Sequence, residues 1–98
     1  MTQPASLLCI GLTTVDVVAL PVRMEPFDGV RLIDAMHMAP AGTAAGTALV
    51  AAKLQVATQL AGAVGEDAAG RFIRRELEHA GVGVALLRCC PACPPPRR

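Results

Sequence analysis

The stretch from residue 39 to 70, APAGTAAGTALVAAKLQVATQLAGAVGEDAAG, constrains the fold of this chain more than any other part of it. Small residues fill its beginning, an apolar run fills its middle, and two acidic residues follow in a turn flanked by glycines. This order predicts a loop, a helix, a buried strand and the start of a second helix. A helix that leads into a buried strand is typical of an α/β protein with a parallel sheet.

The segments before and after this stretch predict further strands of the same sheet. Residues 6–11 (SLLCIG) form a continuous apolar run that ends in glycine, which is typical of a strand covered on both faces. We expect a helix over 44–56, a strand over 58–64, a helix that ends at Gly81 and a third strand over 82–88. This order indicates a parallel α/β sheet that is incomplete where the pattern stops.

The second helix has the clearest amphipathic pattern in the chain. Apolar residues recur on one side of it, at Ala69, Phe72, Ile73, Leu77 and Ala80. The other side is expected to face outward with Arg71, Arg74, Arg75 and Glu78. We expect Glu66 and Asp67 in the first turn, where negative charge stabilises the helix dipole, and Gly81 at the end of the helix.

Residues 17–40 interrupt the series of helices and strands. Two prolines and an Asp-Gly pair break this segment, and its second half alternates only in part between polar and apolar residues. We interpret it as two short strands that are joined by a turn and project from the main sheet as a lid. His37 could contact a ligand there, although the pattern favours an exposed histidine without a catalytic role.

Composition and charge exclude several classes of function. A net charge of +1 provides no basic surface for nucleic acid. No lysine or arginine precedes Arg23, and Asp16 interrupts the apolar run over 7–22, so we expect neither a signal peptide nor a membrane anchor. Without a secretory signal, the four cysteines indicate a reduced, cytoplasmic protein. Cys90 and Cys93 form a C-x-x-C pair without a second pair of ligands, so no metal site is predicted.

Two features of the sequence could bind a substrate. Asp16 follows the first predicted strand, and ligands of open α/β sheets bind beside the carboxyl ends of the strands, where a carboxylate can accept hydrogen bonds from hydroxyl groups. Gly42 and Gly46 lie where the first helix begins, and glycine lets a ligand approach the backbone closely. The alternatives are an aspartate in a turn or a helix cap, and glycines that let the helix pack on the sheet. The glycines match neither the dinucleotide motif nor the phosphate loop.

These motifs resemble those of the PfkB-type (ribokinase-like) carbohydrate kinases, in register from about residue 7 to 88. The resemblance rests on Cys9-Ile10-Gly11 with Asp16, on Ala41-Gly42 before a helix of small residues, and on the string G-x-V-G-x-D-x-x-G-x-F over 62–72. It implies the first strands of a ribokinase-like α/β sheet, with a small β lid over a sugar. The fold class that we expect is therefore an incomplete ribokinase-like parallel sheet flanked by helices.

The resemblance also implies a substrate site. Asp16 is expected to bind substrate hydroxyls, and Ala41 and Gly42 stand where a glycine pair of the family contacts the substrate. Gly46 replaces an asparagine that the family usually has, which leaves the sugar contact at this position and the identity of the sugar or nucleoside open. The turn over 65–70 is expected mainly to place the helix that follows it.

The same resemblance implies what is missing from residues 1–98. The family's G-A-G-D motif, whose aspartate deprotonates the sugar hydroxyl, does not occur in them. ATP and Mg²⁺ are implied by the family only, and no residue is identified for either. Residues 89–98 (CCPACPPPRR) form a Cys, Pro and Arg-rich tail that is expected to be irregular, as in a truncated or frameshifted gene product. A proline-rich ligand for a partner is the alternative.

We therefore expect residues 1–88 to be the N-terminal part of an ATP-dependent sugar or nucleoside kinase that is inactive alone. One alternative is a non-catalytic module that binds a sugar or self-associates through the lid or through exposed sheet edges. A second is an unstable fragment without a function.

Overall fold

The computed structural model describes residues 6–20, 29 and 32–91, and these residues form five strands and two helices. In chain order these are β1 (Ser6–Ile10), β2 (Thr14–Leu20), β3 (Ala35–Ala41), α1 (Thr43–Lys53), β4 (Ala57–Gly65), α2 (Ala68–His79) and β5 (Leu87–Cys90). The predicted order of strand, lid, helix, strand, helix and strand is confirmed.

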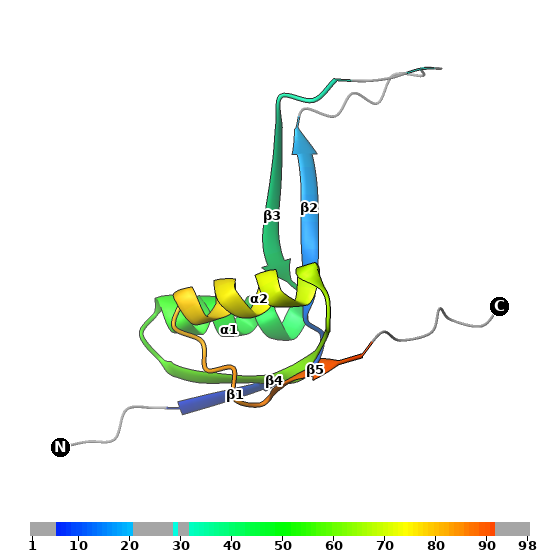
Figure 1. Ribbon diagram of the computed structural model, residues 1–98. Helices are drawn as coiled ribbons and strands as arrows, with labels where there is room; N and C mark the ends of the chain where they lie inside the picture. The colour runs from blue at the N-terminus through cyan, green and yellow to red at the C-terminus, as the bar shows by residue number, and fades with distance from the viewer. Residues whose placement is uncertain (1–5, 21–28, 30–31, 92–98) are drawn as a thin grey trace.

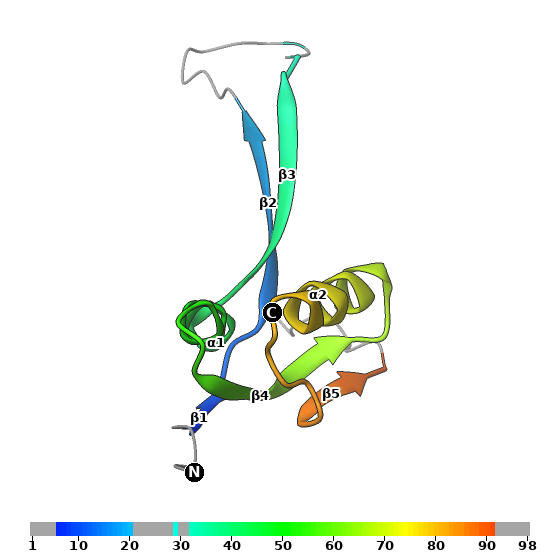
Figure 2. The ribbon, with the colours of Figure 1, turned by 90° about the vertical axis from the view of Figure 1, so that its left-hand side faces the viewer.

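Three of the strands form a parallel sheet in the order β1-β4-β5. Both helices cover the same face of this sheet (Figures 1 and 2). The reason is that the two crossover connections, β1 to β4 and β4 to β5, proceed in the same direction, and right-handed crossovers then place their helices on one side. The predicted parallel α/β sheet is thus confirmed, but the described residues cover only one of its two faces.

The core lies between this sheet and the two helices. α1 packs on β1 and β4 through alanines, of which Ala45 and Ala48 are fully buried. Such small side chains let the helix approach the sheet closely. Leu60 of β4 and Leu77 of α2 are the largest fully buried side chains in the described residues. The core is therefore aliphatic, with Phe72 only packed against its border.

β2 and β3 form an antiparallel hairpin that stands away from the sheet on the side of the helices (Figure 1). The pairing runs from Thr14 opposite Ala41 to Leu20 opposite Ala35. This hairpin is the predicted lid, although its first strand begins at Thr14 and not near residue 17. Most of the connection between the strands, 21–28 and 30–31, lies outside the described residues.

Two predicted boundaries are wrong by several residues. α1 ends at Lys53 instead of continuing to residue 56, because the chain turns at Gln55, whose φ is 64°. The third strand of the sheet begins at Leu87 and not at Val82, since Gly83 makes only an isolated bridge with Gln59 before a turn. β5 continues through Cys90, so Cys89 and Cys90 belong to the sheet and not to an irregular tail. Residues 92–98 lie outside the described residues.

Arg74 does not extend freely into solvent as its place on the helix predicted. Its guanidinium donates hydrogen bonds to the carbonyl oxygens of Val84 and Leu87, at 3.3 and 2.6 Å. Arg74 therefore ties α2 to the segment that leads into β5. The predicted end of α2 is confirmed: Gly81 N–H donates to Glu78 O and Val82 N–H to Leu77 O, both at 3.0 Å, which is the hydrogen-bond pattern of a Schellman motif.

Candidate functional site

The carboxyl ends of the parallel strands lie where the hairpin leaves the sheet and where both helices begin (Figure 1). Ligands of open α/β sheets bind at this edge. The backbone is crowded there: a Cβ atom on Gly62 of β4 would lie 2.9 Å from Gly11 O and 3.1 Å from Thr13 Oγ1. The candidate site is therefore the junction of the β1 exit loop, the base of the hairpin and the start of α1.

Gly42 joins the hairpin to α1 and has a structural reason to be glycine. Its φ is 97°, and a Cβ atom would lie 2.5 Å from Leu12 O. The same oxygen accepts a hydrogen bond from Ala45 N–H at 3.4 Å. Close packing, which the sequence left as an alternative, is therefore present at Gly42. No side chain caps the N-terminus of α1, whose free N–H groups favour a ligand oxygen. Contact of Gly42 with a substrate stays a prediction.

Asp16 lies within β2, exposed, and opposite Ala39. It is neither in a turn nor at a helix cap, so that alternative interpretation is wrong. It lies two residues beyond the start of the hairpin, which leaves the sheet at the carboxyl ends of the parallel strands (Figure 1). Since side chains alternate along a strand, Asp16 and Thr14 share one face of the hairpin with Ala41, which pairs with Thr14. The structure thus brings Asp16 and Ala41 to the same surface, next to Gly42.

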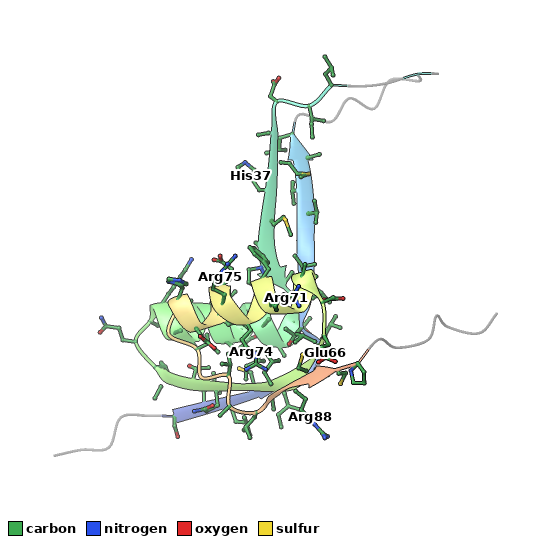
Figure 3. All side chains as sticks on the ribbon, in the orientation of Figure 1. His37, Glu66, Arg71, Arg74, Arg75 and Arg88 are labelled. Atoms are coloured by element: carbon green, nitrogen blue, oxygen red, sulfur yellow. The ribbon has the colours of Figure 1, made fainter. Side chains whose placement is uncertain are left out.

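His37 lies on this same face of the hairpin. It pairs with Val18, two residues beyond Asp16, which makes Asp16 and His37 diagonal neighbours. The imidazole projects from β3 toward the side on which the helices extend (Figure 3). The predicted exposure of His37 is confirmed. Its proximity to Asp16 was missed, because the sequence does not define the register of the hairpin, which decides the face of every residue.

Gly46 lies one turn farther along α1, where its N–H donates to Gly42 O at 2.8 Å. A Cβ atom at this position would have nothing within 4 Å. Gly46 opens into a groove between α1 and the free edge of β1, which it lines together with Ser6 and Leu7. Three of the four predicted residues therefore meet at the hairpin base, and the fourth extends from them along the helix.

The turn over 65–70 has a structural explanation for each of its conspicuous residues. The Asp67 carboxylate caps α2 by accepting a hydrogen bond from Gly70 N–H at 2.8 Å. Asp67 is thus the N-cap, and neither it nor Glu66 lies in the first turn as expected. A Cβ atom on Gly65 would lie 2.8 Å from Asp67 Oδ2, and one on Gly70 would overlap the Gly65 carbonyl oxygen. The motif places α2 against the end of β4.

Comparison with known proteins relates this arrangement to one family. The family model described as pfkB family carbohydrate kinase matches residues 4–91. No curated protein matches the sequence. The described residues contain no helix that is long and apolar enough to cross a membrane. They also contain no group of three or more His, Cys, Asp or Glu side chains that could hold a metal ion.

Solved structures of similar fold carry names from the same group of enzymes. A putative ribokinase from Agrobacterium tumefaciens superimposes with a TM-score of 0.82 at 24% identity, over 92% of this chain and 29% of that one. A fructokinase from Xylella fastidiosa with bound ATP gives a TM-score of 0.70 at 26% identity, over 90% of this chain and 26% of that one. Arabidopsis thaliana ribokinase complexed with ribose and ATP gives a TM-score of 0.66 at 26% identity, over 90% of this chain and 28% of that one. The chain therefore spans less than a third of the length of these structures.

Proposed function

Since the chain belongs to the pfkB family of carbohydrate kinases, we propose that it is the substrate-binding, N-terminal portion of an ATP-dependent sugar or nucleoside kinase. In this proposal it acts in the cytoplasm, and residues 1–98 alone bind the substrate but do not phosphorylate it. The substrate is a small molecule with several hydroxyl groups, and nucleic acid is not a partner.

The observation that carries this proposal is the meeting of Asp16, Ala41 and Gly42 at the base of the hairpin. A carboxylate accepts hydrogen bonds from hydroxyl groups, and the backbone around Gly42 offers N–H donors at the start of α1. A carboxylate acceptor on the hairpin base and N–H donors at the start of the next helix suit a polyol. The lengths of the Arabidopsis and Xylella structures, which hold ATP, support placing the phosphoryl-transfer residues outside this chain.

The described residues do not fit a nucleotide with its metal ion. Phosphoryl transfer depends on positioning and on charge stabilisation by metal ions and by a catalytic base. Asp16 and Asp67 are not grouped with further ligands for a metal ion, and Asp67 is engaged as the cap of α2. No step of phosphoryl transfer is therefore assigned to the residues of this chain.

The proposal is tested by the thermal stability of the purified chain with ribose, fructose or adenosine. A ligand at ten times its dissociation constant stabilises the folded state by about 1.4 kcal/mol, which raises the midpoint of a domain of this size by several degrees. We expect Asp16→Ala to lose this rise. The matched control Asp34→Ala, an exposed acid near the far end of the hairpin, should keep it. The proposal is wrong if no ligand gives a rise, or if ATP is consumed with any of them.

The second candidate is a non-catalytic interaction module, and the hairpin favours it. Its other face consists only of apolar residues, which are Val15, Val17, Ala19, Met36, Met38 and Pro40. Such a face is suited to a protein partner. The nucleotide sequence beyond the codon for Arg98 decides between the candidates: a reading frame that encodes further strands and a G-A-G-D motif supports the kinase, and its absence supports the module.

A further inference from the structure

The base of the hairpin lies between the beginnings of the two helices, with α1 on one side and α2 on the other (Figure 2). On the side of α1 it is tied through the backbone, because Leu12 O accepts a hydrogen bond from Ala45 N–H. In the part of the chain that the structure describes, no backbone hydrogen bond joins the hairpin to α2. α2 nevertheless lies against both β2 and β3. The support that α2 gives to the hairpin therefore comes from side chains.

The two flanks of α2 face different neighbours. Ile73 is buried against the sheet, and successive residues of a helix are rotated by about 100°, so Phe72 and Arg74 lie on opposite flanks. The Arg74 guanidinium donates to Val84 O and Leu87 O, which places its flank beside β5. In the sheet order β1-β4-β5, the Phe72 flank is then directed toward the side of β1, from which the hairpin leaves.

Burial marks the place where the hairpin meets this flank. Phe72 is half-buried and packs against the border of the core, and Val15 of β2 does the same. Pro40, which pairs with Val15, is also half-buried. Farther along the same face of the hairpin, Val17 is 55% exposed and Met38 is 46% exposed. The apolar face of the hairpin is thus covered only at its base, where α2 lies against it.

We propose that Phe72 is a positioning residue for Asp16, because it holds the base of the hairpin against α2. Val15 and Asp16 are consecutive in β2, so their side chains point to opposite faces of the hairpin. With Val15 held at the border of the core, the Asp16 carboxylate is directed to the face that it shares with Ala41. This inference rests on the proposed function, in which Asp16 binds the substrate and Phe72 does not touch it.

The size of the ring explains why this position matters. A packed aromatic side chain buries about 150–250 Å², and a two-stranded hairpin has little stability of its own. Alanine at position 72 would leave a methyl group where the ring now packs. The remaining tie at Leu12 O lies on the side of α1, and it does not oppose rotation of the hairpin away from α2. We therefore expect the hairpin to lose its fixed orientation while the parallel sheet stays folded.

Hydrogen exchange of the full chain, measured by mass spectrometry of its peptides, tests this role without a ligand. Phe72→Ala should raise the exchange rates over 14–20 and 35–41 at least about tenfold relative to those of β4, because the hairpin opens before the sheet unfolds. Phe72→Leu keeps a large apolar side chain and should stay within about threefold of the parent chain. The control Val84→Ala changes a half-buried side chain on the β5 side of α2, and it should leave the ratio of the two rates unchanged.

Thermal unfolding of the same variants with ribose, fructose or adenosine connects the hairpin to Asp16. At ten times the dissociation constant of the parent chain, a tenfold loss of affinity reduces the rise in the midpoint to about a third. We expect this reduction in Phe72→Ala, and neither in Phe72→Leu nor in Val84→Ala.

The two measurements separate the role of Phe72 from the proposed function. A parent chain without any rise in its midpoint would contradict the proposed function, whereas the exchange ratio still decides whether Phe72 holds the hairpin. The role of Phe72 is overturned by equal increases in exchange over the hairpin and β4 in Phe72→Ala, or by the same change of the ratio in Val84→Ala. A loosened hairpin that keeps the full ligand response would overturn the positioning of Asp16.

Discussion

The turn over residues 65–70 is proposed to pack α2 closely against the end of β4. Substitution of Gly70 by alanine, compared with the same substitution at Gly46, tests this explanation. Both glycines lie in helices. A methyl group on Gly70 would overlap the Gly65 carbonyl oxygen, whereas one on Gly46 would have nothing within 4 Å. The two changes are chemically identical and differ only in the space around them.

The expected effects have opposite signs. Alanine in place of glycine inside a helix stabilises the folded state by about 0.5–1 kcal/mol, and nothing opposes this gain at Gly46. At Gly70 the start of α2 must move away from the end of β4, and overpacking of this kind costs about 1–3 kcal/mol or more. The same movement weakens the Asp67 cap, worth about 1 kcal/mol. With the gain from alanine subtracted, we expect a net loss of about 1–3.5 kcal/mol for Gly70→Ala.

Thermal unfolding followed by circular dichroism measures both changes. One kcal/mol corresponds to about 4–8 °C for a domain of this size. Gly46→Ala should raise the midpoint by about 2–8 °C, and Gly70→Ala should lower it by at least about 4 °C. Equal effects, or a Gly70→Ala variant that is the more stable of the two, would refute the packing explanation of the turn.

Two further substitutions test single contacts of α2 by urea unfolding. Asp67→Ala removes the carboxylate that accepts the hydrogen bond from Gly70 N–H, and it should lower the free energy of unfolding by about 1 kcal/mol. Asp67→Ser should keep most of the stability, because serine is also a good N-cap. Arg74→Met removes the hydrogen bonds to Val84 O and Leu87 O and should cost about 1–2 kcal/mol. The control Arg75→Met, at an exposed position of the same helix, should stay within about 0.5 kcal/mol of the parent chain; equal costs at the two arginines would contradict the role of Arg74.

The elements of the parallel sheet were predictable because local sequence determines them. The periodicity of α2 and the glycine at its end define a helix without reference to the rest of the chain. The end of α1 was not predictable in this way, since Leu54 and Val56 continue the apolar pattern past the point at which the chain turns at Gln55. The start of β5 was missed for a similar reason. Val82 and Val84 have the composition of a strand, but Gly83 makes only one bridge to Gln59 before the chain turns.

The candidate site was predictable in its residues and not in its geometry. Asp16 and Gly42 are conspicuous by residue type and by position relative to the predicted elements. Their relation depends on the register of the hairpin, and a shift by one residue would move Asp16 to the opposite face. That register also places His37 beside Asp16. The role of Arg74 was hidden because its partners are carbonyl oxygens, which every residue has, so no sequence signal marks them.

The sequence of β1 predicts more burial than the structure provides. The continuous apolar run of β1 predicted a strand buried on both faces, yet Leu8 is 51% exposed and Ile10 is 73% exposed. Both belong to the face opposite the helices, on which Arg88 also lies (Figure 3). Parallel sheets are stable when both faces are covered. The sequence of β1 therefore encodes burial that residues 6–20, 29 and 32–91 do not supply. A chain that exposes Leu8 and Ile10 in this way should bind a hydrophobic dye, and absence of dye binding would contradict the exposure of this face.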